Sequence, residues 1–212
     1  MSTLLFIESS PRKSASASTT VARSFLDAYA RAHPGDTVET MDVWSMRLPE
    51  FDGAAMEAKY AGLRGEERTP AQAAAWAEIS LIAQRVRGAD KLLLAIPMWN
   101  FGIPYKLKHL IDAISQKDLL FTFDASGFGG LVAAKKAVVI YARGIDYGPE
   151  ATFGTPAAQW DQQKPYIDLW LRFIGVHDVF TIIAEKTLMG AEASETELGA
   201  ARAEAVKLAA HF

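Results

Sequence analysis

The sequence contains no cysteine and only four histidines, and both shortages limit its chemistry. Without cysteine the chain has no disulfide, no thiolate nucleophile, no zinc knuckle and no cysteine-ligated iron–sulfur cluster. The histidines are scattered without the spacing of metal ligands, at His33, His109, His177 and His211. We therefore expect no metal site in the protein.

Long apolar runs and an excess of basic residues are also missing. No stretch approaches about 18 consecutive apolar residues, so we expect no transmembrane helix. The formal net charge is −3, which gives no basic footprint for nucleic acid. The first residues, MSTLLFIES, show no basic segment before an apolar one and no small-residue cleavage site. We expect a cytoplasmic protein with neither a membrane nor a nucleic-acid partner.

Apolar residues make up 50% of the 212 residues, and they recur in short runs separated by amphipathic segments. Such runs predict buried strands, and the segments between them predict helices. The expected strands are residues 4–8, 37–43, 92–96, 136–142 and 179–184. Strands separated by helices form a parallel, doubly wound sheet. We predict one α/β domain over residues 1–212, with a five-stranded sheet of order 2-1-3-4-5 and helices on both faces.

Three further segments carry expectations that depend on turn and capping residues. A proline and three glycines interrupt residues 44–65, which predicts irregular structure there. Residues 118–130 alternate and then turn through glycines, which predicts a hairpin lying over the ligand-binding edge of the sheet. The capping box formed by Ser194 and Glu197 predicts the start of the terminal helix.

The loop after the first predicted strand bears most directly on the class of ligand. It has neither the G-x-G-x-x-G of dinucleotide folds nor the G-x-x-x-x-G-K-[ST] of P-loops. Instead it places hydroxyl groups just ahead of a predicted helix, on Ser10, Ser14, Ser16, Ser18 and Thr19. The free N–H groups and positive dipole end of a helix favour an anion, and hydroxyl donors suit a terminal phosphate monoester.

Other classes of protein that use the loop after the first strand need residues that this sequence does not have. A low-molecular-weight phosphatase needs a cysteine here, and a serine hydrolase needs G-x-S-x-G. A receiver domain needs acidic residues at strand ends, whereas the third predicted strand ends in Pro97 and Met98. A flavin mononucleotide (FMN) site is what remains. The alternative interpretation is a polar loop with a single helix N-cap.

The segment PMWNFGI, residues 97–103, follows the third predicted strand, at the edge where open α/β sheets bind ligands. An apolar bed and backbone donors for a flat ring are offered by Met98, Trp99, Asn100 and Phe101. Arg143 and Gly144 follow the next strand, on the adjacent side of the same crevice. Because a flavin brings its own redox chemistry, a site of this kind needs no catalytic His/Asp or Cys pair.

The sequence PMWNFGIPYKLK, residues 97–108, resembles the FMN-dependent NADH-azoreductases, a flavodoxin-like family of azoreductases and quinone reductases. The resemblance extends to the serines at 9–10 and 16–18, to ARGI at 142–145 and to LRFIG at 171–175. It implies a flavodoxin-like fold that binds FMN without a covalent bond. It also implies that NADH or NADPH is the electron donor. Quinones and aromatic azo compounds would be reduced by two electrons in a ping-pong reaction.

The resemblance also implies roles for individual residues. The phosphate and ribityl end of FMN would be held by Ser10, Ser16, Ala17 and Ser18. The isoalloxazine ring would be bound by Met98, Trp99, Asn100 and Phe101. The neighbouring loop would contact the flavin through Ala142, Arg143, Gly144 and Ile145. The family is homodimeric with active sites at the subunit interface, where Phe123 and Trp170 match aromatic residues that wall the substrate pocket. The alternative interpretation of Trp170 is a core residue of an amphipathic helix.

One loop departs from the family pattern, which often reads Ser/Thr-Arg-Gly-Gly. Here Ala142 removes a hydroxyl contact and Ile145 narrows the pocket, which bears on the choice of acceptor. Two other functions stay open: a flavodoxin-type electron-transfer protein and a non-catalytic flavin-binding module. The near-neutral charge and the extra segments 44–65 and 118–130 favour the enzyme, because electron carriers are usually smaller and strongly acidic.

Overall fold

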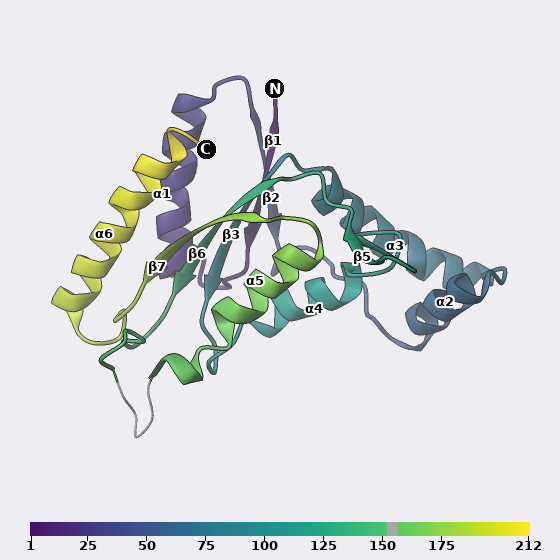
Figure 1. Ribbon diagram of the computed structural model, residues 1–212. Coiled ribbons are helices and arrows are strands. Elements are labelled where there is room, and N and C mark those ends of the chain that lie inside the picture. Colours follow the sequence, from purple (N-terminus) through teal and green to yellow (C-terminus); the bar gives the residue numbers. More distant parts are fainter. Residues whose placement is uncertain (152–156) are drawn as a thin grey trace.

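The computed structural model describes residues 1–151 and 157–212. A five-stranded sheet of order β2-β1-β3-β6-β7 forms its centre (Figure 1). Its strands are β1 (Thr3–Glu8), β2 (Thr37–Asp42), β3 (Lys91–Pro97), β6 (Lys136–Ala142) and β7 (Asp178–Ala184). Every neighbouring pair is parallel. Numbered within this sheet the order is 2-1-3-4-5, which confirms the predicted topology.

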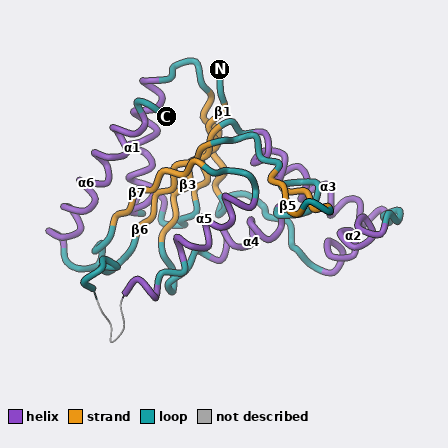
Figure 2. The backbone as a smooth tube through the Cα atoms, viewed as in Figure 1, coloured by secondary structure: helices purple, strands orange, loops and turns teal. Residues whose placement is uncertain are grey.

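Helices cover both faces of the sheet (Figures 1 and 2). They are α1 (Ala17–Ala32), α2 (Gly53–Arg64), α3 (Pro70–Gly88), α4 (Tyr105–Ile114), α5 (Gln163–Phe173) and α6 (Ala191–Ala209). Helices α1 and α6 pack on one face, and α3, α4 and α5 pack on the other. Helix α2 extends away from the sheet alongside α3 (Figure 1).

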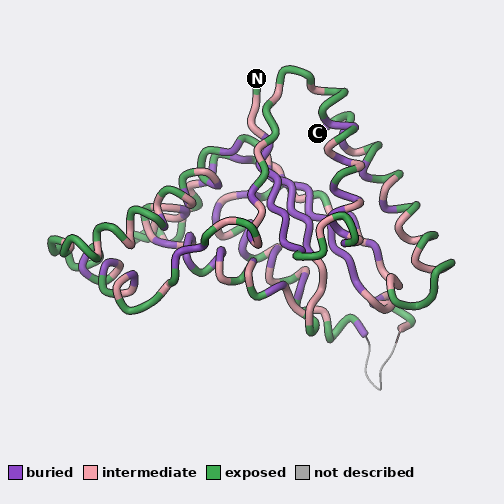
Figure 3. The backbone as a smooth tube through the Cα atoms, turned by 180° about the vertical axis from the view of Figure 1, so that it is seen from behind, coloured by how far each residue is buried: buried purple, intermediate pink, exposed green. Residues whose placement is uncertain are grey.

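The strands at the centre of the sheet are buried on both faces (Figure 3). Successive side chains of a strand point to opposite faces, so each strand serves two cores. In β1, Leu4 and Phe6 join the core under α1 and α6, whereas Leu5 and Ile7 join the core under α3, α4 and α5. This pattern explains why the central strands β1, β3 and β6 are continuous apolar runs rather than alternating ones.

The prediction of irregular structure over residues 44–65 is wrong for its second half, which forms α2. The side chain of Asp52 caps the helix by accepting from the amides of Ala54 and Ala55. Gly65 ends it in the left-handed region with φ 71°. Two of the three glycines therefore mark the ends of a helix instead of interrupting it. Its buried alanines pack on α3.

The terminal helix begins at Ala191, three residues before the predicted capping box. The amide of Ser194 donates to the carbonyl oxygen of Gly190 at 3.0 Å, so Ser194 lies inside the first turn. The predicted start is wrong because the preceding residues, Ala191, Glu192 and Ala193, continue the helix without a break.

A hairpin, β4 (Phe121–Asp124) paired with β5 (Gly127–Gly130), confirms the predicted antiparallel excursion. Its base is fixed at the amino edge of the sheet, since Val132 donates to Ile174 at 3.1 Å and Ala133 donates to Arg87 at 2.8 Å. Those two acceptors lie just before β7 and β3 begin. Figure 2 shows the hairpin beside α3, away from the carboxyl ends of the strands. Within one chain, the expectation that it covers the ligand-binding edge is wrong.

In the described ranges 1–151 and 157–212, no helix is both long and apolar enough to cross a membrane. In the same ranges, no three His, Cys, Asp or Glu side chains are grouped so that they could hold a metal ion.

Candidate active site

The carboxyl ends of β1, β3 and β6 lie side by side, and we call this the ligand edge. Ser9 donates its amide to Ala95 at 3.3 Å, and Met98 donates its amide to Ala142 at 2.8 Å. These bonds join the strand ends from which three segments extend: the serine loop (residues 9–16), the Trp99 turn (residues 99–102) and the Arg143 loop (residues 142–145). The structure thus brings the three sets of predicted FMN-binding residues together.

The serine loop leads into the N-terminus of α1, and most of the hydroxyl groups here are buried, with Ser14 exposed. Ser10, Ser16 and Ser18 are at most 3% exposed, and the hydroxyls of Ser16 and Ser18 lie 3.2 Å apart. Ser16 is the N-cap residue, yet its side chain caps no amide of the helix. Thr19 Oγ1 is also buried, with no partner in the described part of the chain. The first turn of α1 therefore keeps donors for an anion.

Lysine is not the anion-binding group of this loop. Lys13 Nζ forms an ion pair and hydrogen bond with Asp42 and lies 3.5 Å from Glu8. Burial raises the pKa of Asp42, but hydrogen bonds from Lys13 and Ser45 outweigh burial and hold that pKa below its ordinary value. Because two carboxylates offset the charge of Lys13, this side chain has little free charge to offer an anion, and the hydroxyl and amide donors of the loop become the main candidates.

Trp44 connects the segment after β2 to both parts of the ligand edge. Its indole Nε1 donates to the carbonyl oxygen of Ser9 at 2.9 Å. Its ring lies 5.7 Å from that of Trp99 and 5.3 Å from that of Tyr105, measured between centroids. This aromatic group fixes the serine loop relative to the Trp99 turn.

The Trp99 turn is a two-residue reverse turn closed at both ends. Trp99 and Gly102 exchange two backbone hydrogen bonds of 3.0 and 2.9 Å. Both central residues are left-handed, with φ 46° at Asn100 and φ 70° at Phe101. A non-glycine residue there costs energy, and such strain concentrates at functional sites. The structure gives no acceptor among the described residues for the amides of Asn100 and Phe101, so both can donate to a ligand.

In the Arg143 loop the carbonyl oxygens of residues 143–145 are occupied, and Arg143 donates its amide to Ala184 at 2.9 Å. Lys186, Thr187 and Leu188 donate their amides to the carbonyl oxygens of Ile145, Arg143 and Gly144 at 2.9–3.4 Å. The amides of Gly144 and Ile145 have no acceptor in the described ranges. The loop thus offers backbone donors next to those of the Trp99 turn.

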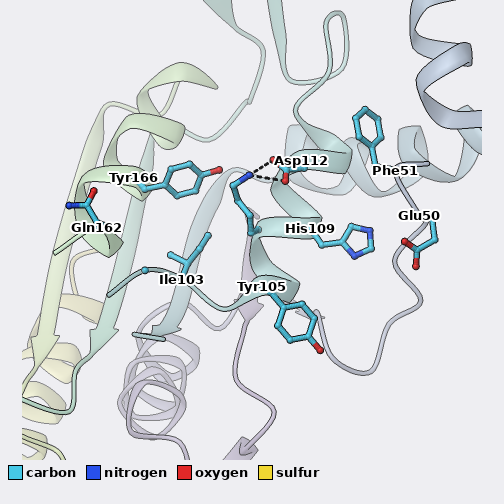
Figure 4. Close-up of a pocket in the computed structure, with 10 residues that line it drawn as sticks. Glu50, Phe51, Ile103, Tyr105, His109, Asp112, Gln162 and Tyr166 are labelled. Carbon is cyan, nitrogen blue, oxygen red and sulfur yellow. Dashed lines mark hydrogen bonds and ion pairs between the residues drawn. The ribbon is translucent and has the colours of Figure 1, made fainter. Parts of the chain in front are cut away.

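A groove of about 740 Å³ continues from the Trp99 turn onto α4 (Figure 4). Ile103 and Tyr105 stand at its start, and Tyr166 of α5 faces Asp112 across it. His109 turns toward the segment of Glu50 and Phe51 and contacts the carbonyl oxygen of Pro49 at 2.8 Å. The groove is open and aromatic, which suits a planar molecule or another protein surface.

Comparison with known proteins identifies the family of this chain. A family model described as the flavodoxin-like fold matches residues 2–209. An FMN-dependent NADH:quinone oxidoreductase of Burkholderia lata is 56% identical over 191 residues, 90% of each chain. One from Desulfotalea psychrophila is 47% identical over 99% of this chain and 97% of its own. The chain belongs to the flavodoxin-like family.

Solved structures of the flavodoxin-like family superpose closely on this chain. An azoreductase from Bacillus anthracis str. Sterne has a TM-score of 0.89 at 27% identity, with both chains covered fully. An FMN-dependent NADH-azoreductase from another Bacillus anthracis strain, solved in complex with FMN, has a TM-score of 0.83 at 24% identity. The match covers 99% of this chain and 100% of that one. At 24% identity the second likeness concerns the fold alone.

Not every predicted site residue of this flavodoxin-like chain reaches the ligand edge. Phe123 is 54% exposed and lies in the hairpin, with its ring 4.6 Å from that of Phe128. Trp170 is 4% exposed in the core and donates its indole N–H to Ser115 at 3.0 Å. Trp170 thus takes the core position that was the alternative interpretation. Arg143 lies at the edge, but its side chain is 4% exposed and turns inward.

Sequence analysis does not predict three residues that organise the ligand edge of this flavodoxin-like chain. Trp44 lies in a segment predicted as irregular, and its partner Ser9 is 35 residues away. Asp161 and Gln163 contact Arg143 from the start of α5. A polar residue before an amphipathic helix, such as Asp161, is ordinarily interpreted as a helix cap. No pattern in the sequence predicts that Gln163 is fully buried.

Proposed function

We propose that this chain binds FMN at the ligand edge and transfers two electrons from NADH or NADPH to quinones and aromatic azo compounds. The observation that carries the proposal is the set of unused donors on three adjacent loops. Relatives named FMN-dependent NADH:quinone oxidoreductases, 56% and 47% identical over nearly the whole chain, support it. An azoreductase of matching fold supports the azo acceptors.

The residues present fit the phosphate end of FMN. The N-terminus of α1 combines buried hydroxyls, an N-cap side chain that caps no amide, and the unpartnered Thr19 Oγ1. Such a terminus attracts a phosphate through amide donors and the helix dipole. Ser10, Ser16 and Ser18 would add hydroxyl donors, with Ala17 contributing its amide at the first helical position.

The residues present also fit the ring end. Amides of Asn100, Phe101, Gly144 and Ile145 are free to donate to ring nitrogen and oxygen atoms. Met98 and Trp99 are half-buried beside them and would supply apolar contact. When bound, FMN supplies the hydride-accepting chemistry, and these amides favour the negative charge that a reduced ring carries.

The nicotinamide that donates electrons and the quinone or azo compound that accepts them would use the same open side of the site, one after the other. Both nicotinamide and quinone are planar, and the Trp99 turn covers one side of the site. We therefore propose a ping-pong order, in which the oxidised nicotinamide leaves before the acceptor binds. Ile145 is half-buried in the Arg143 loop and would limit the width of acceptors.

We further propose that two copies of the chain form the working site. Phe123 lies on a hairpin rooted at the amino edge, so it cannot line the ligand edge of its own chain. It is exposed together with Phe128, while Phe101 and Tyr105 are exposed at the ligand edge. Aromatic residues exposed on two separate surfaces suit an isologous contact between copies. Trp170 would support the hairpin from within the core.

Anaerobic stopped-flow measurement tests this function. The purified protein should release FMN on denaturation, and NADH should bleach the bound flavin before any acceptor is added. Benzoquinone and methyl red should then restore the flavin colour at a rate at least as fast as steady-state turnover. A protein that takes up no FMN contradicts the cofactor. Bound FMN that NADH does not reduce indicates an electron carrier or a flavin-binding module instead.

A further inference from the structure

Arg143 is a buried cation at the ligand edge whose guanidinium does not face the open side of the site. Its Nη1 donates to Glu185 at 2.9 Å, its Nη2 to Asp161 at 2.5 Å and its Nε to Gln163 at 3.3 Å. Every nitrogen of the guanidinium is thus engaged, and two carboxylates offset its charge. Arg143 is held in place within the protein and is unsuited to binding an anionic ligand.

Gln163 carries this network across to the strand before the Trp99 turn. The side chain is fully buried, and its Nε2 donates to the carbonyl oxygen of Ile96 at 3.0 Å. Its Oε1 accepts from Arg143. Arginine only donates and a carbonyl only accepts, so the bridge needs a side chain with both functions. An amide satisfies this requirement and a carboxylate does not.

The first residue of α5 and the two residues before it hold both ligand loops at once. Gln162 donates its amide to the carbonyl oxygen of Phe101 at 2.9 Å. Asp161 accepts from the amides of Gln163 and Lys164, the first two residues of the helix, with Oδ1, and from Arg143 with Oδ2. Three consecutive residues, 161–163, therefore bind the Trp99 turn, the end of β3 and the Arg143 loop.

We propose that Arg143 and Gln163 are positioning residues that set the separation between the Trp99 turn and the Arg143 loop, and thereby the affinity and reduction potential of bound FMN. This inference rests on the proposed function. The donors for the ring belong to these two loops, and hydrogen bonds weaken steeply with distance and angle. A small change in separation therefore removes donors from the ring. We call Arg143, Gln163 and their hydrogen bonds the brace. Because the ring donors favour the reduced ring more than the oxidised ring, loosening the brace lowers the reduction potential of bound FMN.

The variants Q163E and R143K test the brace. Q163E keeps the shape of residue 163 but places an acceptor against the Ile96 carbonyl. R143K keeps the charge but cannot reach two carboxylates and the amide together. Q116E is the matched control, because Gln116 is also buried and donates to Asp112 and Ala113 at the end of α4, away from both loops.

Two measurements decide the outcome: FMN titration of each apoprotein by flavin fluorescence, and the midpoint potential of bound FMN. We expect Q163E to raise the dissociation constant at least tenfold and R143K to raise it severalfold. A tenfold greater loss for reduced than for oxidised FMN lowers the two-electron potential by about 30 mV. Q116E should lower the melting temperature and leave affinity and potential within twofold and a few millivolts of wild type.

Wild-type affinity and potential in both brace variants, with only a lower melting temperature, would overturn the brace. If Q163E does not fold, R143K decides alone. Wild-type affinity and potential in R143K would then overturn the brace, because a positive charge without the arginine geometry would be sufficient. Failure of the wild-type protein to bind FMN overturns the proposed function. That result is distinct from wild-type binding with unchanged variants, which overturns the brace alone.

Discussion

The indole N–H of Trp44 donates to the backbone carbonyl oxygen of Ser9 across 2.9 Å, and Ser9 itself is fully buried. The variant W44F keeps most of the aromatic packing but leaves this carbonyl without the donor. An unsatisfied buried acceptor costs about 1–3 kcal/mol. We expect a lower melting temperature and a several-fold weaker affinity for FMN, measured by differential scanning fluorimetry and flavin titration. W76F, which changes a tryptophan on α3 beside Arg68, should bind FMN like wild type.

The variant S16A tests the phosphate end of the proposed FMN site. A hydroxyl donor to a charged phosphate contributes about 1.5–3 kcal/mol, so FMN should bind roughly tenfold or more weakly. Riboflavin, which lacks the phosphate, should bind S16A and wild type alike. Since Ser16 caps no helix amide with its side chain, the apoprotein should lose little stability. S14A removes an exposed hydroxyl of the same loop and should change neither affinity. An equal loss for riboflavin and FMN would refute the phosphate contact.

Asp36 connects three elements at the amino edge of the sheet and makes the stability of the fold depend on pH. It accepts from Tyr29 at 2.7 Å, from the amide of Ser2 at 2.7 Å and from Lys91 at 3.3 Å. The hydrogen bond from Tyr29, followed by that from Ser2, lowers the pKa of Asp36 to about 2. Because the unfolded carboxyl binds its proton at higher pH, this contribution is complete above about pH 4 and is lost toward pH 2.

The variant D36N tests this pH dependence. At pH 7 it should unfold at lower urea concentration than wild type. The difference between the two proteins should shrink as the pH falls from 4 to 2. D27N removes an exposed carboxylate on α1 and serves as the control. A difference between D36N and wild type that stays constant down to pH 2 would show that Asp36 acts by packing instead of by charge.

Two glycines with opposite surroundings give a matched pair of alanine variants. A Cβ on Gly130 would lie 2.2 Å from the backbone nitrogen of Gly175, so G130A must push the hairpin away from the end of α5. Gly199 lies within α6 and has nothing within 4 Å of its Cβ position. G199A should stabilise the protein by about 0.5–1 kcal/mol. G130A should destabilise it and increase proteolysis within residues 118–131. Equal unfolding midpoints for the two variants would contradict the close contact.

Sequence analysis predicts the sheet and the ligand loops because both depend on local patterns. Buried strands are continuous apolar runs, and in a parallel sheet the loops after them meet at one edge. Ser16, Asn100 and Gly144 follow strand ends and can be found in this way. Helix α2 is missed because its stability comes from caps at Asp52 and Gly65 and from packing on α3, and not from its own hydrophobic pattern.

The direction of Arg143 could not be read from the sequence. Its partners Asp161, Gln163 and Glu185 are 18, 20 and 42 residues away, and no local pattern connects them. The same limit applies to the hairpin, whose strands are predictable while its position depends on the Gly130–Gly175 contact. Local periodicity thus predicts which residues follow a strand, whereas long-range polar contacts decide which way each side chain turns.

The doubly closed Trp99 turn bears on how quickly the protein takes up a cofactor. Two backbone hydrogen bonds between Trp99 and Gly102 close the turn around its left-handed residues, and Gln162 donates to the carbonyl oxygen of Phe101, so contacts within the chain order the turn. The conformational entropy of ordering this turn is therefore lost when the chain folds, and not when the cofactor arrives. Cofactor and apoprotein should associate in a single step whose rate rises linearly with cofactor concentration, because the Trp99 turn does not have to close first.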